Sequence, residues 1–296
     1  MSEPAGAPVV VGIDGSQAAT DAARWAAAVA ERVHRPLLLA HTYPDEAMFY
    51  NGTAMMIDAQ FMQQMRDDSN TMLETVEKRV LADHPGLAVE RDVRSGTASS
   101  HLIELSREAR MVVVGARGTG AVADYLLGST MLRTVNHAQC PVAVFRGGSA
   151  AVPDGRGVVV GVDGSAISEK AVEQAFAFAD TFGVELDAVH AWSGERMHGL
   201  GRASTHVDWS AYEEAEKAVL SESLAGWCDR YPDVRVHGSS VEGVPADILL
   251  QRAADAQLLV VGSHGRGTVA GSLLGSVSQN LVHHAPCPVL VCRVPR

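Results

Sequence analysis

Short apolar runs alternate with longer amphipathic stretches along the first half of the chain. Runs that are apolar almost throughout are typical of strands buried on both faces of a parallel sheet, whereas apolar residues at i, i+3 and i+4 indicate helices. The predicted strands are residues 8–14, 35–43, 87–93, 111–116 and 140–146. The predicted helices are residues 17–33, 58–84, 98–109 and a segment near residue 131.

The second half of the chain repeats this pattern. "VVVGIDGS" from Val9 recurs as "VVVGVDGS" from Val158, and "QCPVAVFR" from Gln139 recurs as "PCPVLVCR" from Pro286. Nearly constant offsets indicate a duplicated domain of about 147 residues rather than a solenoid repeat. The Gly- and Pro-rich segment at residues 147–157 has linker composition, so we expect domains at residues 1–149 and 150–296.

Alternating strands and helices predict an α/β fold. Each copy is expected to form a doubly wound, Rossmann-like sheet of five parallel strands with helices on both faces. Ligands of such sheets bind outside the carboxyl ends of the strands, where the strand order reverses. Asp14 follows the first strand and Gly115 ends the fourth, so both are expected to face that crevice.

A glycine-rich stretch follows the fourth strand of each copy with identical spacing. It consists of Gly115, Gly118, Gly128 and Ser129 in the first copy, and of Gly262, Gly265, Gly275 and Ser276 in the second. We expect positive φ and close backbone approach at the first two glycines, and Ser129 as the N-cap of the last helix. Free N–H groups there suit a di- or triphosphate. The alternative is a turn glycine followed by an ordinary helix start, and duplication preserves structural glycines as well as functional ones.

Other phosphate motifs do not account for these glycines. The chain contains no GxxxxGK[ST] sequence, and hence no Walker lysine. "GRGTVA" from Gly265 fits the loose dinucleotide fingerprint, but it follows the fourth strand rather than the first. No acidic residue stands about 20 positions later, so we interpret that match as false.

The motifs together resemble those of the universal stress proteins, in the tandem two-domain form of actinobacterial type. The resemblance rests on "GIDGS" after the first strand, "HTY" and "HAW" at the end of the second, and the G-x2-G-x9-G-[ST] stretch in each copy. It implies a parallel sheet of order 3-2-1-4-5 and, in members with this stretch, ATP binding. It covers essentially the whole chain.

The resemblance also implies a nucleotide site in each domain. Asp14 and Asp163 are expected beside the ribose and adenine, with backbone groups of Thr42 and Ala191 at the adenine edge. The glycine stretches are expected to hold the ribose and phosphates. The full expected set is Gly12, Asp14, Thr42, Gly115, Gly118, Gly128, Ser129 and Thr130 in the first domain, and Gly161, Asp163, Ala191, Gly262, Gly265, Arg266, Gly275, Ser276 and Val277 in the second.

The two sites are expected to be unequal. Arg266 follows the second glycine in one copy, whereas Thr119 stands there in the other, with Arg117 close by. Val277 is replaced by Thr130, a change that a backbone N–H contact tolerates. We therefore expect weaker phosphate binding in the first domain.

Composition narrows the range of partners. The net charge is −11, which argues against nucleic acid and anionic membrane surfaces, because both need a basic face. An acidic protein that binds ATP is expected to need Mg²⁺ or Mn²⁺ held mainly by the phosphates. The four cysteines form no CxxC pair, which favours buried reduced thiols. The acidic start predicts no secretion signal, so a cytoplasmic protein is expected.

Function is expected to be regulatory rather than catalytic. No Walker lysine and no clear general base are present to transfer a phosphoryl group, so any ATP hydrolysis should be slow. His41 and His190 are interpreted as structural. The alternatives are a nucleotide-transferring enzyme of the same superfamily, whose SGGxDS and HxGH signatures are missing, and an interaction module without nucleotide. The last strands of the copies are expected to pair the two domains within one chain, and a homodimer is also expected.

Overall fold

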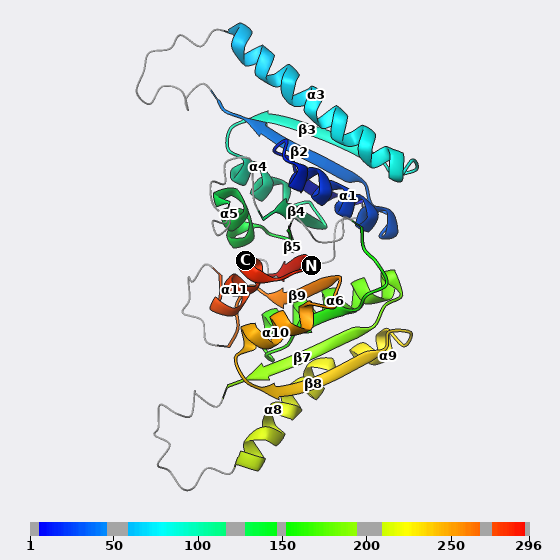
Figure 1. The fold of residues 1–296 in the computed structure, drawn as a ribbon, viewed down its shortest axis with the longest axis vertical. Coiled ribbons are helices and arrows are strands. Elements are labelled where there is room, and N and C mark those ends of the chain that lie inside the picture. Colours follow the sequence, from blue (N-terminus) through cyan, green and yellow to red (C-terminus); the bar gives the residue numbers. More distant parts are fainter. Residues whose placement is uncertain are drawn as a thin grey trace, which may run out of the picture. The chain divides into compact units, whose positions relative to one another are not determined.

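The computed structural model describes residues 6–45, 59–116, 128–146, 152–193, 209–266 and 274–293. These residues form two compact units, Met1–Pro153 and Asp154–Arg296. Each unit is described by itself (Figure 1).

The first unit alternates strands and helices along the chain. Its elements are β1 (Val9–Gly12), α1 (Gln17–Arg32), β2 (Leu37–Tyr43), α3 (Ala59–Asp83), β3 (Val89–Ser95), α4 (Ala98–Leu105), β4 (Met111–Gly115), α5 (Ser129–His137) and β5 (Val142–Phe145). The strands are parallel, in the order β3-β2-β1-β4-β5. The predicted fold class and strand order are confirmed.

The second unit repeats this arrangement. Its elements are β6 (Val158–Gly161), α6 (Ala166–Phe182), β7 (Leu186–Trp192), α8 (Trp209–Leu224), α9 (Trp227–Arg230), β8 (Val236–Glu242), α10 (Pro245–Ala253), β9 (Leu258–Gly262), α11 (Ser276–His284) and β10 (Val289–Cys292). The strand order is β8-β7-β6-β9-β10, again parallel. The helix that corresponds to α3 is interrupted after Leu224, and Gly226, with a φ of 78°, is the N-cap of α9.

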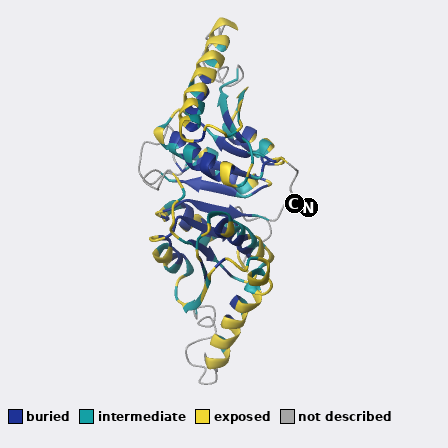
Figure 2. Cartoon of the chain, turned by 90° about the vertical axis from the view of Figure 1, so that its right-hand side faces the viewer, coloured by how far each residue is buried: buried dark blue, intermediate teal, exposed yellow. Residues whose placement is uncertain are grey.

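Helices cover both faces of each sheet. In the first unit α1 and α3 pack together on one face, and α4 and α5 pack together on the other. In the second unit α6 and α8 form one layer, and α10 and α11 form the other. The helices are amphipathic, so their outer faces are exposed, while inner strands such as β1, β4, β6 and β9 are buried (Figure 2).

The valine-rich strands explain the core. Val9, Val10 and Val11 in β1 are fully buried, as is Val158 in β6. Each such side chain contributes about 1.5–3 kcal/mol on burial. Helix starts are also set locally: the Ser16 hydroxyl accepts a hydrogen bond from the Ala19 N–H at 3.1 Å, which caps α1.

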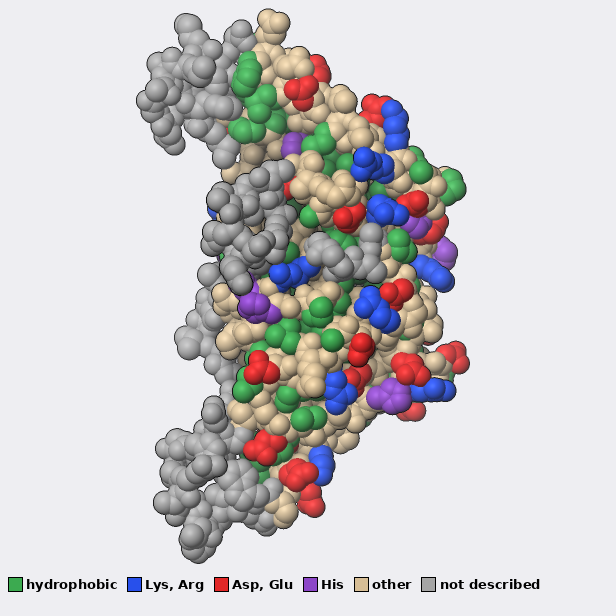
Figure 3. All heavy atoms as spheres, viewed as in Figure 1, with side chains coloured by type: hydrophobic (Ala, Val, Ile, Leu, Met, Phe, Trp, Pro, Cys, Tyr) green, Lys and Arg blue, Asp and Glu red, His purple; other side chains and the backbone are tan. Residues whose placement is uncertain are grey.

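The cysteines are mostly buried, and the surface carries side chains of both charges. Cys140, Cys287 and Cys292 are buried and Cys228 is exposed, all four as free thiols. Figure 3 shows acidic and basic side chains interspersed over one face. No helix in the described part of the chain has the length and hydropathy to cross a membrane.

Candidate nucleotide site

The carboxyl ends of the central strands define a crevice in the second unit. After β6 the chain adds β7 and β8 on one side, and then β9 and β10 on the other, so the strand order reverses between β6 and β9. Val160 is the register partner of Val260, which brings the ends of β6 and β9, Gly161 and Gly262, to the same edge. Ligands of doubly wound sheets bind at such a reversal.

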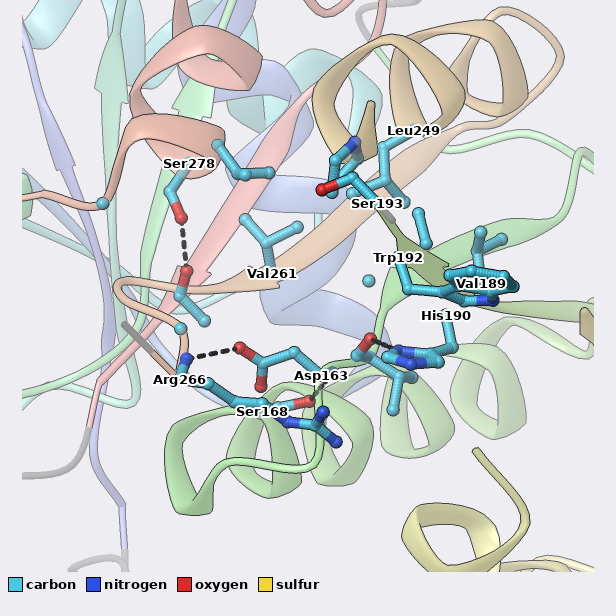
Figure 4. A pocket seen from close by; sticks show the side chains of 18 of the residues that line it. Asp163, Ser168, Val189, His190, Trp192, Ser193, Leu249, Val261, Arg266 and Ser278 are labelled. Atoms are coloured by element: carbon cyan, nitrogen blue, oxygen red, sulfur yellow. Dashed lines mark hydrogen bonds between the residues drawn. The ribbon is translucent and has the colours of Figure 1, made fainter. Parts of the chain in front are cut away.

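A cavity of about 450 Å³ opens at this edge, a volume within the range of small-molecule sites. All nine residues that the sequence predicts for the second domain line it: Gly161, Asp163, Ala191, Gly262, Gly265, Arg266, Gly275, Ser276 and Val277. The structure thus brings together residues from four separate segments. Figure 4 shows the cavity with the side chains that surround it.

Asp163 connects the end of β6 to the glycine stretch. Its Oδ1 accepts a hydrogen bond from the Ser165 N–H at 2.9 Å. Its Oδ2 accepts one from the Arg266 N–H at 3.1 Å (Figure 4). The Asp163 N–H donates to the Ser168 hydroxyl at 3.0 Å. The carboxylate therefore fixes the backbone on both sides of the crevice.

The glycines of this stretch are required by close approach rather than by backbone conformation. A Cβ on Gly265 would lie 2.5 Å from Asp163 Oδ2, and one on Gly262 would lie 2.8 Å from Ile167 Cγ2. Neither residue has positive φ, and neither does Gly115, so that part of the expectation is wrong. Positive φ occurs instead at Gly15 (84°) and Gly164 (74°), directly after the two aspartates.

The last helix of the first unit is not capped by Ser129 as predicted, and the last helix of the second unit begins in the same way. Gly128 and Gly275, not the serines, are the N-caps of α5 and α11, and Ser129 and Ser276 are the first helical residues. The cap position needs extended backbone, which glycine adopts freely. Because glycine has no side chain, no side-chain hydrogen bond caps either helix. An α-helix leaves its first N–H groups without an intrahelical acceptor, so those of α11 are available to an anion.

His190 is a structural residue with an additional acidic partner. Its Nδ1 donates to the Val162 carbonyl at 2.7 Å, and its Nε2 lies 2.6 Å from Glu216 Oε2. Burial by itself raises the pKa of Glu216, but hydrogen bonds from His190 and Tyr212 and the charge of Arg266 hold that pKa below its ordinary value. Glu216 is thus a carboxylate inside the cavity wall.

Aromatic side chains form another part of the wall. Trp192 and Tyr212 meet edge to face, with ring centroids 5.3 Å apart. The Trp192 indole N–H donates to the Ser240 hydroxyl at 3.1 Å, which fixes the ring. Sequence reasoning missed Tyr212 and Glu216, because α8 carries no motif and only its packing brings it to the cavity.

In the first unit the described residues have the same plan. Gly12 and Gly115 end the adjacent parallel strands β1 and β4, and the Asp14 Oδ1 accepts from the Ser16 N–H at 3.0 Å. His41 Nδ1 donates to the Ile13 carbonyl at 2.7 Å, and Thr42 lies near the end of β2.

The third glycine of the stretch makes the equivalent backbone hydrogen bond in both units. The Gly128 N–H donates to the Ala116 carbonyl at 3.4 Å, as the Gly275 N–H donates to the Ser263 carbonyl at 2.8 Å. Thr130 lies in the first turn of α5. Gly118, with Arg117 and Thr119, lies outside the described residues.

Comparisons with known proteins agree with this architecture. The model of the universal stress protein family matches residues 7–146 and again residues 156–293. The chain belongs to the universal stress protein family. It is 39% identical over 291 residues to a universal stress protein of Mycolicibacterium smegmatis, covering 96% of each chain. It is 40% identical over 290 residues to one of Mycobacterium tuberculosis, again with 96% of each covered.

Solved structures show the same fold. A universal stress protein from Archaeoglobus fulgidus superimposes with a TM-score of 0.69 at 19% identity, covering 97% of this chain and 98% of that one. The tandem arrangement predicted from the sequence is therefore shared along the whole length of these relatives.

Proposed function

We propose that this universal stress protein binds ATP in each domain and acts as a regulatory protein rather than as an enzyme. The single observation that carries the proposal is the cavity of the second unit, where an aspartate, a glycine stretch and a helix start converge. The aromatic wall formed by Trp192 and Tyr212 suits a planar base, and the N–H groups at the start of α11 suit phosphate.

The residues present fit a nucleotide with a metal ion held by the phosphates. In this proposal the backbone of Gly265, Ser276 and Val277 holds the phosphates, and Asp163 and Ala191 lie toward the nucleoside. The described residues contain no group of three or more His, Cys, Asp or Glu side chains that would hold a metal. Mg²⁺ or Mn²⁺ would therefore enter with ATP and neutralise its charge.

A regulatory role is favoured because the described cavity residues offer no arrangement for phosphoryl transfer. Arg266 is paired with Glu216, and Asp163 is engaged with the backbone on both sides. Arginine stays protonated and has no acceptor, so Arg266 cannot act as a general base, and the Asp163 carboxylate is engaged in holding the backbone. The expected output is a change in conformation or assembly on binding, through pairing of domains or of chains, in the cytoplasm.

The test is to purify the protein without added nucleotide, denature it and identify any released small molecule by mass spectrometry. We expect one or two equivalents of ATP per chain. Calorimetric titration of stripped protein with Mg-ATP then gives the stoichiometry. A stripped, folded protein that shows no heat and no thermal stabilisation with millimolar Mg-ATP would overturn the proposal in favour of a nucleotide-free interaction module.

A further inference from the structure

The position of Glu216 has an equivalent in the first unit, and the two residues differ. Met72 of α3 lies against Gly15, with its Sδ 3.0 Å from the position of a Cβ there, and Val219 of α8 lies against Gly164 in the same way at 2.9 Å. The residues three positions earlier on each helix are Ser69 and Glu216, both buried. These two positions therefore correspond between the units.

The two side chains have different partners. The Ser69 hydroxyl donates to the carbonyl of Met65 in its own helix at 2.7 Å. Glu216 instead contacts His190 and lies 3.5 Å from Arg266 Nη1, with only 11% of its side chain exposed. Only the second unit has a buried carboxylate at this position.

Arg266 is held at two points by acidic groups. Its backbone N–H donates to Asp163, and its guanidinium pairs with Glu216. Figure 4 shows the Arg266 side chain extending past Asp163, away from Ser278 in the first turn of α11. Among the described residues that line the cavity, Arg266 is the one lysine or arginine. The Arg266 side chain is 36% exposed, so it has room to leave Glu216.

We propose that Glu216 is a positioning residue that retains Arg266 when the second site is empty, so that a polyphosphate must draw Arg266 away from Glu216 in order to bind. This inference rests on the proposed function. Glu216 and the phosphates of the ligand are both negatively charged and compete for the Arg266 guanidinium. The charge of the ligand therefore sets how completely Arg266 leaves Glu216. A nucleoside without phosphates has no group to compete for the guanidinium. Glu216 thus sets the dependence of the second site on ligand charge.

The substitution E216Q tests this exchange with little change of shape. Nδ1 of His190 donates to the Val162 carbonyl, and the Gln side chain keeps both a donor and an acceptor beside Nε2 in nearly the same shape as Glu. The hydrogen bond is retained while the negative charge is lost. E216S, which reproduces Ser69 of the first unit, is a second variant if E216Q does not fold.

Nucleotide binding is followed by the fluorescence of Trp192, which lines the second cavity, with W192F to assign the signal. We expect E216Q to tighten Mg-ATP binding about five- to tenfold, the scale of a partly buried charged contact. Adenosine affinity should stay unchanged. In an R266Q background the effect of E216Q on ATP should disappear, as a double-mutant cycle requires if Glu216 acts through Arg266.

Three outcomes would overturn the inference: an E216Q affinity for ATP equal to or weaker than that of the wild type, an equal change for adenosine and ATP, or a gain that persists with R266Q. Each leaves the proposed function standing, because ATP still binds. Failure of the wild-type protein to bind ATP or adenosine, by fluorescence and by calorimetry, would instead remove the proposed function and this inference with it.

Discussion

Substitution of Gly265 by alanine gives a direct test of the close approach in the second site. The added methyl carbon would lie 2.5 Å from Asp163 Oδ2, where ordinary contact begins at 3.4 Å. Because the φ of Gly265 is not positive, alanine has no intrinsic backbone penalty at this position. The cost is therefore steric, and the two groups must separate by about 0.9 Å.

That separation would break the hydrogen bond between the Arg266 N–H and Asp163, which is 3.1 Å long. A hydrogen bond to a charged group contributes about 1.5–3 kcal/mol. If ATP requires the closed arrangement, a cost of about 2 kcal/mol corresponds to an affinity about 30-fold weaker at this site. Because this hydrogen bond is present before a ligand binds, G265A should also lower the unfolding temperature of the protein.

The assay is titration with Mg-ATP, followed by Trp192 fluorescence. G155A is the matched control, because a Cβ on Gly155 meets no atom within 4 Å and Gly155 lacks positive φ. Combined with D163A, which removes the colliding carboxylate, G265A should weaken binding much less than it does alone. Wild-type affinity in G265A, or an undiminished loss in the D163A background, would refute the steric explanation.

Three further predictions concern charge, thiols and the core. The pKa of Glu216 is lowered in the folded state. Its carboxylate therefore adds stability above its unfolded pKa, and this stability is lost as the pH falls through the folded pKa. In an acid titration followed by circular dichroism, E216Q should lose less folding stability than the wild type. Burial raises the pKa of Cys287 to about 12, so a thiol reagent at neutral pH should label Cys228 in the native protein and all four cysteines only after denaturation. F176A should destabilise the second unit by about 3–5 kcal/mol in urea unfolding, because the Phe176 ring is fully buried and stacks on Trp227; a change below about 1 kcal/mol would contradict that packing.

Much of the fold could be predicted from local pattern. Strands such as β1 and β6 are buried on both faces, so every residue must be apolar and the run is visible without knowledge of its neighbours. Asp14 and Asp163 stand out because they follow these runs directly. The internal repeat showed which residues of the two domains are equivalent. The strand order followed from the family resemblance, because hydrophobic periodicity does not determine it.

The details of the glycine residues depended on the backbone path. The sequence shows where glycines occur, but not whether each is needed for positive φ, for capping or for close contact. Gly164 has positive φ, Gly275 caps α11, and Gly265 admits the Asp163 carboxylate. These three roles give the same residue type, so only the structure separates them.

Sequence alone therefore determined the duplicated α/β architecture and the segments that carry the candidate site. The tertiary structure decided how the site is walled and charged. Tyr212 and Glu216 lie on α8, a helix with no motif, and they reach the cavity because α8 packs over β7 beside His190. Local sequence constrains the residues next to one another in the chain, whereas a cavity is formed by elements whose proximity arises only from packing.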